Sequence, residues 1–362
     1  MRSPSFLLVG VALAAACGVL RREAIVIGAA GPFKQPYGLM NLQGIELAID
    51  QVNARGGVRG RPVTLVPRDD DGEAPAAVQI ARGFVDDPRV VAVVGHMSSG
   101  AQLAAANVYD GHLVSVATTA SSPTLTGISP WVFRVISSDS ANGADFARFA
   151  HDMGARRAAV IYENTSYGRG LAHAFLRTFD GSIVAFEPIS GDSGTVFEPY
   201  AAFFKRYAPD VVFLATTQDP AIAMLRELRR QRVRLIFLGI GGSTWKTAVT
   251  DSALSEGIYL GTDFDTEVDR PDVTKFVQAF KAKFNREPDG DAALAYDATM
   301  LVARAIDEVG TNRAAIRDYL HALTPETAMP GVTGPIRFYP TGDPAGRSFV
   351  FLKAHRGRLE AP

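Results

Sequence analysis

Two serine-rich turns contain the residues whose types and spacing could bind a ligand: GHMSSGA at 95–101 and TTASSPT at 118–124. An apolar run precedes each turn, at 90–94 and 113–117, and the segment between them is rich in alanine. A strand, a turn, a helix and a second strand in this order are typical of a parallel sheet. Both turns therefore aim the N–H groups of a helix start at one sheet edge. Such an edge binds anions without a catalytic side chain.

Composition limits the classes of protein and partner. The chain has 362 residues, of which 47% are hydrophobic, and single cores rarely grow past about 250–300 residues. Two packed lobes are therefore expected. The formal net charge is −1, from 37 basic and 38 acidic residues, so no strong field attracts nucleic acid or acidic membranes. We expect the partner to be a small molecule or another protein.

Cys17 is the single cysteine, and it follows an apolar stretch that starts at Phe6 and ends in three alanines. With Arg2 near the start, residues 1–17 indicate an export signal, because the apolar part is shorter than the ~20 residues of a membrane-spanning helix. Small residues before a lone cysteine are similar to a bacterial lipoprotein signal, although Ala14 stands where leucine is preferred. Lipidation of Cys17 and plain cleavage both remain open. Either would leave the protein in the periplasm or on the outer face of the cytoplasmic membrane.

The elements that position the two turns come in two successive series. The first begins with an apolar strand at 24–29 and runs to a strand at 131–135 and a polar exit at 137–140. A second alternation of strands and helices runs from AAVIYEN at 158–164 to GIYLGT at 257–262. This restart after a polar link predicts a second α/β lobe. Three amphipathic helices follow, and the C-terminal stretch alternates as an antiparallel hairpin does.

A hydrolase or a nucleotide-dependent enzyme is the main alternative class. GHMSSG lacks the G-x-S-x-G spacing, GIGGST at 239–244 closes with threonine instead of glycine, and no GKS or GKT phosphate loop occurs. His96 beside Ser98 is the one tempting base and nucleophile pair, and the six histidines form no metal-spaced pair. Three consecutive acids at 69–71 could suggest a metal site, but acids at the positive start of the next helix are the better interpretation. We predict no catalysis, no cofactor and no metal.

Several separated motifs are together similar to one known family. AGPFKQPYG at 30–38, VNARGGVRGRPV at 52–63, the two serine turns, SYGRGLA at 166–172 and AYDA at 295–298 resemble the periplasmic leucine/isoleucine/valine-binding family, in the family's order. The resemblance covers nearly all of the chain after residue 24. Members of this family are solute receptors of ABC importers.

The resemblance implies an α/β fold of the periplasmic binding protein type I. Two Rossmann-like lobes with parallel central sheets are joined by a three-strand hinge, and the ligand is held in the cleft between them. In this chain the crossovers would lie near 137–140, 263–265 and 331–334. The first lobe would contain residues 24–137 and 265–331, and the second lobe residues 138–264 and 332–362.

In the family, the first-lobe turns hold the α-carboxylate of an amino acid, which implies that Ser99 and Ser121 contact the ligand. Hydroxyls and helix-start N–H groups can satisfy a carboxylate without a buried cation. Ordinary helix capping is the alternative role of these serines. The resemblance implies the ligand-binding residues Tyr37, Met97, Ser98, Ser99, Ala120, Ser121, Tyr167, Thr217, Gln218 and Gly241.

Gly241 stands where leucine binders of the family place a carboxylate for the ligand's ammonium, and residues 216–218 replace an aromatic residue. A buried ammonium without a partner costs several kcal/mol. Gly241 therefore predicts a ligand without the α-ammonium, such as an organic acid or amide. The alternative is that Asp219, Asp263 or Asp265 reaches the ammonium from another direction.

These features predict an extracytoplasmic receptor that binds a small carboxylate-bearing ligand, either an amino acid or a related organic acid or amide. The expected partner that receives the ligand is an ABC permease, and the expected state is a monomer. A membrane contact is expected only through the lipid anchor. A ligand-sensing regulatory module of the same fold is the alternative, and a downstream transmembrane or kinase segment would indicate it.

Replacement of the cysteine tests the anchor. If Cys17 is lipidated, Cys17→Ser releases the protein from the membrane fraction and leaves ligand affinity unchanged, because the cysteine lies outside both predicted lobes. Fractionation and immunoblotting measure the release. Retention of the variant in the membrane fraction contradicts the lipid anchor.

Overall fold

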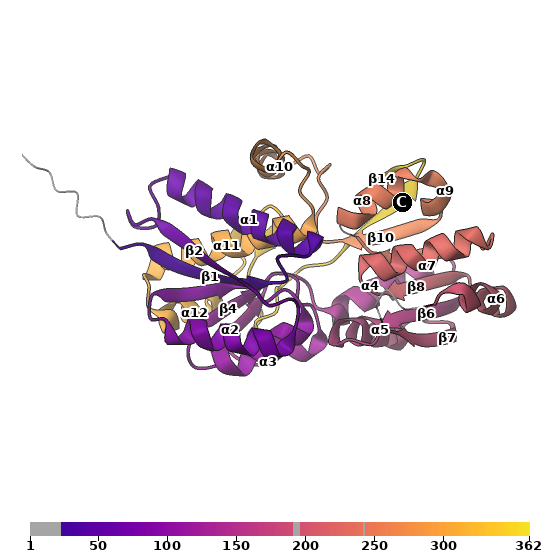
Figure 1. Cartoon of the computed structure of the whole chain (residues 1–362), viewed down its shortest axis with the longest axis horizontal. Coiled ribbons are helices and arrows are strands. Elements are labelled where there is room, and N and C mark those ends of the chain that lie inside the picture. Colours follow the sequence, from indigo (N-terminus) through magenta and orange to yellow (C-terminus); the bar gives the residue numbers. More distant parts are fainter. Residues whose placement is uncertain (1–22, 191–195, 242) are drawn as a thin grey trace, which may run out of the picture.

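The computed structural model describes residues 23–190, 196–241 and 243–362, without the side chains at 243, 244, 246 and 247. The predicted export signal and Cys17 lie outside the described residues. Two lobes lie side by side along the long axis of the molecule, each with its own sheet (Figure 1). No helix of the described ranges is long and apolar enough to span a bilayer.

The first lobe is built on a five-stranded parallel sheet in the order β2-β1-β3-β4-β5. All residues of three of its strands, β1, β3 and β4, are buried, as expected where helices cover both faces of a sheet. The carboxyl ends of these strands meet at one edge, where the two serine turns begin. The strands are β1 (Ile25–Gly31), β2 (Val63–Asp69), β3 (Val90–Val94), β4 (Val114–Ala117) and β5 (Val132–Arg134).

The second lobe contains a seven-stranded sheet in the order β14-β13-β10-β9-β8-β6-β7. The strands from β10 to β7 are parallel, and β13 pairs antiparallel with both β10 and β14. The C-terminal stretch thus forms the antiparallel hairpin that its alternation predicts. The strands are β6 (Arg157–Glu163), β7 (Ser182–Ile189), β8 (Val211–Ala215), β9 (Ile236–Ile240), β10 (Ile258–Thr262), β13 (Val350–His355) and β14 (Arg358–Glu360).

Helices cover each sheet, and the last three return to the first lobe. Buried residues of α11, such as Leu294 and Leu301, share one core with Ile27 of β1. The first-lobe elements are α1 (Pro36–Ala54), α2 (Ala74–Asp86), α3 (Ser99–Tyr109), the 3-10 helix η1 (Pro123–Leu125), α10 (Pro271–Phe284), α11 (Gly290–Val309), α12 (Arg313–His321), β11 (Met329–Gly331) and β12 (Gly334–Ile336). The second-lobe helices are α4 (Asp139–Asp152), α5 (Ser166–Thr178), α6 (Glu198–Tyr207), α7 (Gln218–Arg230), α8 (Ser243–Thr250) and α9 (Ser252–Ser255).

Three segments carry the chain between the lobes. Residues 135–138 link β5 to α4, and residues 263–270 link β10 to α10. The third passage, at 346–349, leads into β13 of the second sheet. Three separate chain segments thus join the two lobes, and they lie close to one another in the middle of the molecule (Figure 1).

The third crossover lies later than the predicted 331–334, and residues 332–345 do not belong to the second lobe. Phe338 packs in the first-lobe core, and Arg134 N donates a hydrogen bond to Gly342 O (3.1 Å). Residues 331–334, where the resemblance placed the crossover, instead form the tight turn of the β11–β12 hairpin. The prediction was wrong because the turn at 331–334 keeps the chain in the first lobe, and a turn in the sequence does not specify which sheet follows it.

The two lobes also touch directly. Gly170 of α5 lies against Pro123 of η1, and a Cβ at Gly170 would be 2.5 Å from Pro123 Cδ. Glycine lets the helix of the second lobe approach the second serine turn of the first lobe with no side chain between them. This contact explains one glycine of the SYGRGLA motif.

A pair of helical glycines tests how tightly α1 packs on α11. A Cβ at Gly44 would lie 2.1 Å from Ala292 O, so we expect Gly44→Ala to lower the free energy of unfolding by about 1–3 kcal/mol. Gly83, exposed on α2, has open space around its Cβ position. Gly83→Ala should instead raise stability by up to ~1 kcal/mol through helix propensity. Chemical denaturation compares them, and equal effects would contradict the close packing.

Candidate functional site

The two serine turns lie side by side at the carboxyl edge of the first sheet. Ser98 is the N-cap residue of α3, and Ser99 is the first residue of that helix. Ser99 Oγ accepts a hydrogen bond from Ser122 N (3.1 Å), so the first turn is tied to the second. Ser122 Oγ accepts from Thr124 N and caps η1. Two helix starts therefore face one small region, as the spacing of the turns predicted.

Ser121 connects this region to the other lobe. Its Oγ donates to Asp139 Oδ2 (2.9 Å), and Asp139 N donates to Ser121 O (2.8 Å). Asp139 is the first residue of α4 and is buried. The hydroxyl proton of Ser121 is therefore engaged by the Asp139 carboxyl group, and only the lone pairs of Ser121 Oγ remain for another group.

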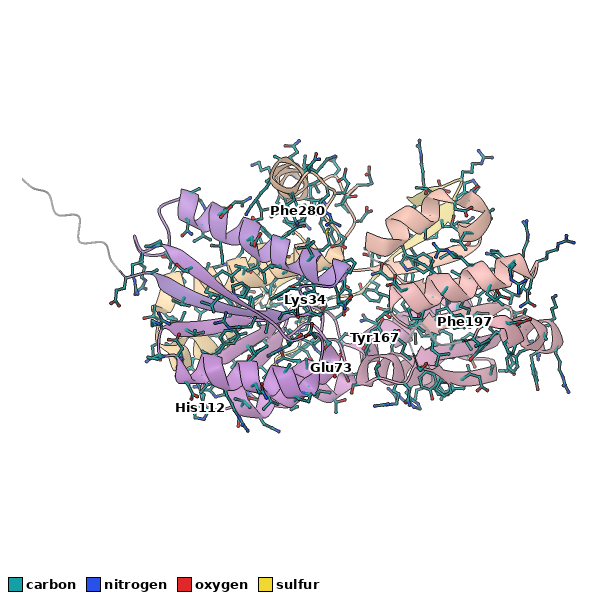
Figure 2. All side chains as sticks on the ribbon, in the orientation of Figure 1. Lys34, Glu73, His112, Tyr167, Phe197 and Phe280 are labelled. Atoms are coloured by element: carbon teal, nitrogen blue, oxygen red, sulfur yellow. The ribbon has the colours of Figure 1, made fainter. Side chains whose placement is uncertain are left out.

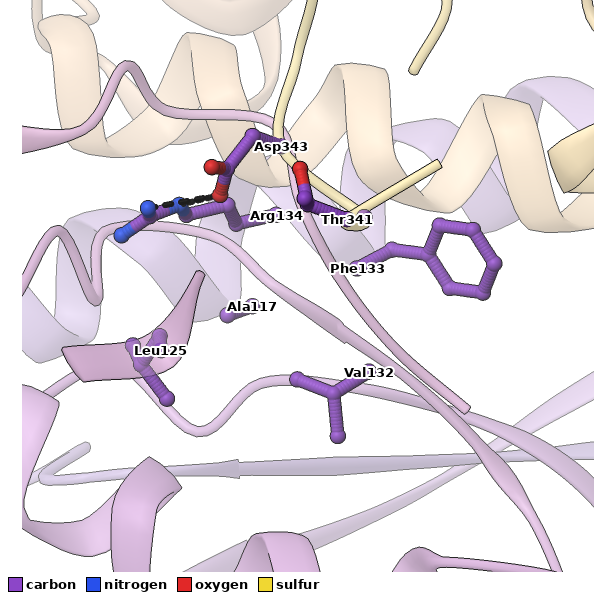
Figure 3. A pocket seen from close by; sticks show the side chains of 8 residues that line it. Ala117, Leu125, Val132, Phe133, Arg134, Thr341 and Asp343 are labelled. Atoms are coloured by element: carbon purple, nitrogen blue, oxygen red, sulfur yellow. Dashed lines mark hydrogen bonds and ion pairs between the residues drawn. The ribbon is translucent and has the colours of Figure 1, made fainter. Parts of the chain in front are cut away.

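Arg134, a buried cation, supports the second serine turn. The sequence did not suggest this role for Arg134. Arg134 Nε and Nη2 lie 2.7 and 2.6 Å from Asp343 Oδ1 (Figure 3). Its Nη1 donates to Ser122 O (2.8 Å). Only 2% of Arg134 is exposed. The guanidinium therefore holds the backbone of the turn in place, and Asp343 balances its charge.

Three of the predicted residues use their side chains within the first lobe. Met97 is buried against Gly31, where a Cβ would lie 2.8 Å from Met97 Sδ. Ser98 Oγ donates to Gly72 O (3.1 Å). Ala120 is fully buried in a small apolar cluster. The side chains of these residues shape the turns, and their contact with a ligand stays a prediction.

Tyr37 and Tyr167 come from opposite lobes. Pro36 is the first residue of α1, so Tyr37, which the sequence placed in a loop, lies in the first helical turn. Burial raises the pKa of the Tyr37 hydroxyl to about 12, and the charges of Asp291 in the first lobe and Glu163 in the second add to the shift. Tyr167, near the start of α5, lies on the side of the second lobe that faces the first (Figure 2). Both rings therefore belong to the region between the lobes.

Four carboxyl groups act electrostatically on Tyr167. Burial raises the pKa of its hydroxyl, and the negative charges of Asp139, Glu163, Asp263 and Asp291 raise it further. Two of these acids belong to the second lobe, Asp263 to the second crossover, and Asp291 to the first turn of α11 in the first lobe. The site thus collects acids from both lobes and the hinge around one aromatic ring.

These carboxyl groups are hard to ionise. Burial raises the pKa of Asp139 to about 7 and that of Asp263 to about 6. Burial also raises the pKa of Glu163 and, helped by the charges of neighbouring acids, that of Asp291. Within the described residues the Asp291 carboxylate has no hydrogen-bond partner. A cation between these acids would favour their ionised forms.

The remaining predicted residues lie at the carboxyl edge of the second sheet. Thr217 donates from both its N–H (3.0 Å) and its hydroxyl to Glu163 Oε1. Gln218 is the first residue of α7. Gly241 N donates to Gly261 O (2.7 Å), and a Cβ there would lie 3.3 Å from that oxygen. The Gly241 position is therefore tightly placed beside β10.

The three aspartates considered as substitutes for a carboxylate at Gly241 lie in different surroundings. Asp263 is close enough to Tyr167 to raise the pKa of its hydroxyl. Asp219 acts on Tyr37 in the same way, although it comes last among the causes of that shift. Asp265 Oδ1 accepts a hydrogen bond within its own turn (2.9 Å). Asp263 is therefore the best placed of the three.

Sequence reasoning missed Asp139, Glu163 and Asp291. An acid in the first turn of a helix is usually explained by the helix dipole, and this interpretation hides Asp139 and Asp291. Glu163 is the last residue of a buried strand, and an acid at such a position is the one feature of the sequence that could have indicated a functional residue. Nothing in the local sequence indicates that the three converge on Tyr167.

The base and nucleophile pair considered above does not form. The His96 ring nitrogens contact Asp70 Oδ2 (2.6 Å) and Tyr109 Oη (3.0 Å), and all three residues are buried. Ser98 donates elsewhere, to Gly72 O. His96 therefore holds β2 and α3 together.

The sequence suggested that the acids at 69–71 stand at the start of the next helix. The structure places them before it. The helix α2 begins at Ala74 with no acid in its first turn. Asp70 instead pairs with His96, because tertiary contact offers it a buried partner. Within the part of the chain that the structure describes, no group of three or more His, Cys, Asp or Glu residues could hold a metal ion.

Comparison with known proteins identifies the family. The model of the periplasmic binding protein family matches residues 24–358. The chain belongs to the periplasmic binding protein family. A curated relative, the leucine-, isoleucine-, valine-, threonine- and alanine-binding protein of Pseudomonas aeruginosa, is 29% identical over 348 residues, which cover 92% of this chain and 91% of the relative.

Solved structures of the same family share the whole fold. The substrate-binding protein of Desulfitobacterium hafniense in complex with Leu has a TM-score of 0.81 and 29% identity, and 93% of this chain and 99% of that chain are covered. The branched-chain amino acid transporter substrate-binding protein of Streptococcus pneumoniae in complex with isoleucine has a TM-score of 0.84 and 25% identity, with 93% and 98% covered. The fold is the periplasmic binding protein type I fold, and these relatives are substrate-binding proteins.

The pKa of Asp139 predicts how stability depends on pH. Below pH 4 the carboxyl is protonated in both the folded and unfolded states. Between pH 4 and about 7 the carboxyl ionises in the unfolded state and stays protonated in the folded state, so the folded state loses stability as the pH rises. The difference between the two pKa values corresponds to a loss on the order of 4 kcal/mol above pH 7. Asp139→Asn removes this loss, so its stability relative to wild type should rise from pH 4.5 to pH 8.

Chemical denaturation at three pH values measures the effect. Asp152→Asn is a matched control in the same helix, since the Asp152 side chain is 78% exposed. Parallel pH profiles for wild type and Asp139→Asn contradict the assigned pKa shift.

Proposed function

We propose that this protein is the extracytoplasmic receptor of an ABC importer, and that it binds an α-amino acid between its lobes and delivers it to a permease. The observation that carries the proposal is the hydrogen bond from Ser121 Oγ of the second serine turn to Asp139 Oδ2 (2.9 Å), since Asp139 is one of four carboxyl groups, from both lobes and the hinge, that act electrostatically on Tyr167. An anion-binding edge next to an acidic region suits a ligand that carries both charges.

The carboxylate end of the ligand would be held by the first lobe. The starts of α3 and η1 offer N–H groups, and hydroxyls at Ser99 and Ser121 lie within the same region. Asp139 lies close by, and protonation of its carboxyl would free the Ser121 hydroxyl proton for the ligand. A carboxylate accepts such charge-assisted hydrogen bonds at about twice the strength of neutral ones.

The ammonium end would be held by Asp291 and Asp263. The Asp291 carboxylate lacks a hydrogen-bond partner within the described residues, and Asp263 is contacted by the backbone and the hydroxyl of Ser137 (Oγ at 3.4 Å) and lies in the field of Arg347. Burial makes both costly to ionise, and a ligand ammonium between them would relieve that cost. Tyr37 and Tyr167 would cover the apolar part of the ligand from the two lobes.

Gly241 supports the competing proposal of an organic acid or amide without the α-ammonium. The acids around Tyr167 favour the amino acid instead, since they supply a partner that Gly241 cannot. The ligands bound in the two solved relatives, Leu and isoleucine, support the same choice. Leucine is therefore the first ligand to test.

The relatives also support the setting of the proposed receptor. An exported receptor anchored through Cys17 would stay near its permease, and a monomer suffices because both walls of the proposed site come from one chain. The sensor alternative has no specific observation in its favour. The hydrolase alternative required His96 as the base for Ser98, but the His96 ring is engaged by Asp70 and Tyr109.

Two ligands and two variants test the proposed site. We expect leucine to bind more tightly than its des-amino analogue, 4-methylpentanoate. Asp291→Asn should weaken leucine by tenfold or more and change the analogue little, because only leucine carries the ammonium. Ser121→Ala should weaken both ligands equally, by about 1.5–3 kcal/mol, through loss of a hydrogen bond to a charged group. Calorimetric titration of both ligands into the wild type and the two variants measures all six affinities.

Asp318→Asn is the matched control, because the Asp318 side chain is 64% exposed on α12, where it pairs with Arg317. Tighter binding of 4-methylpentanoate than of leucine would support the organic-acid proposal instead. Unchanged affinities in both site variants would place the ligand elsewhere.

A further inference from the structure

A groove of about 480 Å³ opens on the first lobe, between α1, α10, α11 and β11. None of the residues proposed above to contact the transported ligand lines it. Its volume falls in the range of small-molecule sites, roughly 300–1,000 Å³. In Figure 1 the helix α10 lies over α1 and α11, so the groove is formed where these helices meet.

The floor of the groove is apolar and includes two aromatic rings. The Phe276 and Tyr296 ring centroids are 4.9 Å apart, and Met329 and Val332 are buried beside them. The Tyr296 hydroxyl donates to Gln51 Oε1 (2.7 Å), which fixes the position of its ring. This floor can pack against a flat or branched apolar body.

Three cations surround the floor: Arg55, directly after α1, Lys275 of α10 and Arg304 of α11. Arg55 Nε donates to the Gln51 carbonyl (3.1 Å) and Nη2 to Met300 Sδ (3.9 Å), and its charge has no acidic partner within the described chain. Lys275 and Arg304 have neither an acid nor a hydrogen-bond acceptor among the described residues. These three side chains can therefore turn toward an anion.

The acids of the groove do not balance this charge. Asp272 forms an ion pair with Arg270. Asp297 is buried, and its two oxygens accept from Val332 N (2.9 Å) and Thr333 N (2.9 Å). Both carboxylates are thus engaged by groups of the protein itself. The groove is left with a net positive lining over an apolar floor.

We propose that this groove binds a small organic anion with an aromatic or branched apolar body, at a second site separate from the one between the lobes. Guanidinium groups bind carboxylates and sulfonates through paired hydrogen bonds, and the aromatic floor takes the apolar part of the molecule. The charge complementarity of the lining selects an anion over a neutral or cationic compound. The second site does not depend on the identity of the transported ligand.

Naphthalene-2-sulfonate is the probe that tests this site, and naphthalene-2-sulfonamide is its neutral counterpart. We expect the sulfonate to bind the purified protein more tightly than the sulfonamide. The double variant Lys275→Gln with Arg304→Gln should weaken the sulfonate by at least about tenfold and leave the sulfonamide unchanged. Saturating leucine should not displace the sulfonate. Intrinsic probe fluorescence or calorimetry measures each affinity.

Lys205→Gln with Arg226→Gln is the matched control, because it removes the same charge from exposed positions of the second lobe. This control should bind the sulfonate as the wild type does. Equal weakening in both double variants, no binding at millimolar sulfonate, or displacement by leucine would each overturn the proposal. Self-association that the groove variant alone abolishes would also overturn it, because the groove would then contact a second copy of the chain.

Discussion

The two hydrogen bonds between Ser121 and Asp139 are the contact on which the site between the lobes depends. One residue ends a turn of the first lobe, and the other starts the first helix of the second lobe. The first crossover lies directly before Asp139, so this pair ties the lobes together beside one of the segments that join them. Because Asp139 is buried, its protonation controls what Ser121 can donate. Lobe geometry and ligand chemistry therefore meet in one pair of side chains.

Charged side chains connect the crossovers to one another. Arg347, in the third crossover, lowers the pKa of Asp263 in the second, although burial of that carboxyl raises it more. Arg347 Nη1 also donates to Thr333 Oγ1 (2.7 Å), and Thr333 N is held by Asp297 of α11. One network thus runs from a helix of the first lobe through two crossovers to the acids near Tyr167. A charged ligand among those acids would act on the same network.

Much of this fold could be predicted from the sequence, because its main signals are local. Buried parallel strands are apolar runs, helices repeat their apolar residues at helical spacing, and serine-rich turns separate them. These signals gave the two sheets, the C-terminal hairpin and the nearness of the two serine turns. The family resemblance added the three crossovers, but it placed the third too early, because a turn in the sequence does not specify the sheet that follows it.

By itself, the sequence determined the two α/β lobes and a first-lobe edge suited to anions, since both follow from residue types and spacing within short segments. Only the tertiary structure decided that Asp291 and Asp263 approach Tyr167 from different parts of the chain. It also decided that Ser98 Oγ donates to Gly72 O and that the His96 ring contacts Asp70 and Tyr109. The physical reason is that hydrogen-bond partners and charge neighbours are set by contacts between residues distant in sequence, whereas hydrophobic periodicity records only which side of each element is buried.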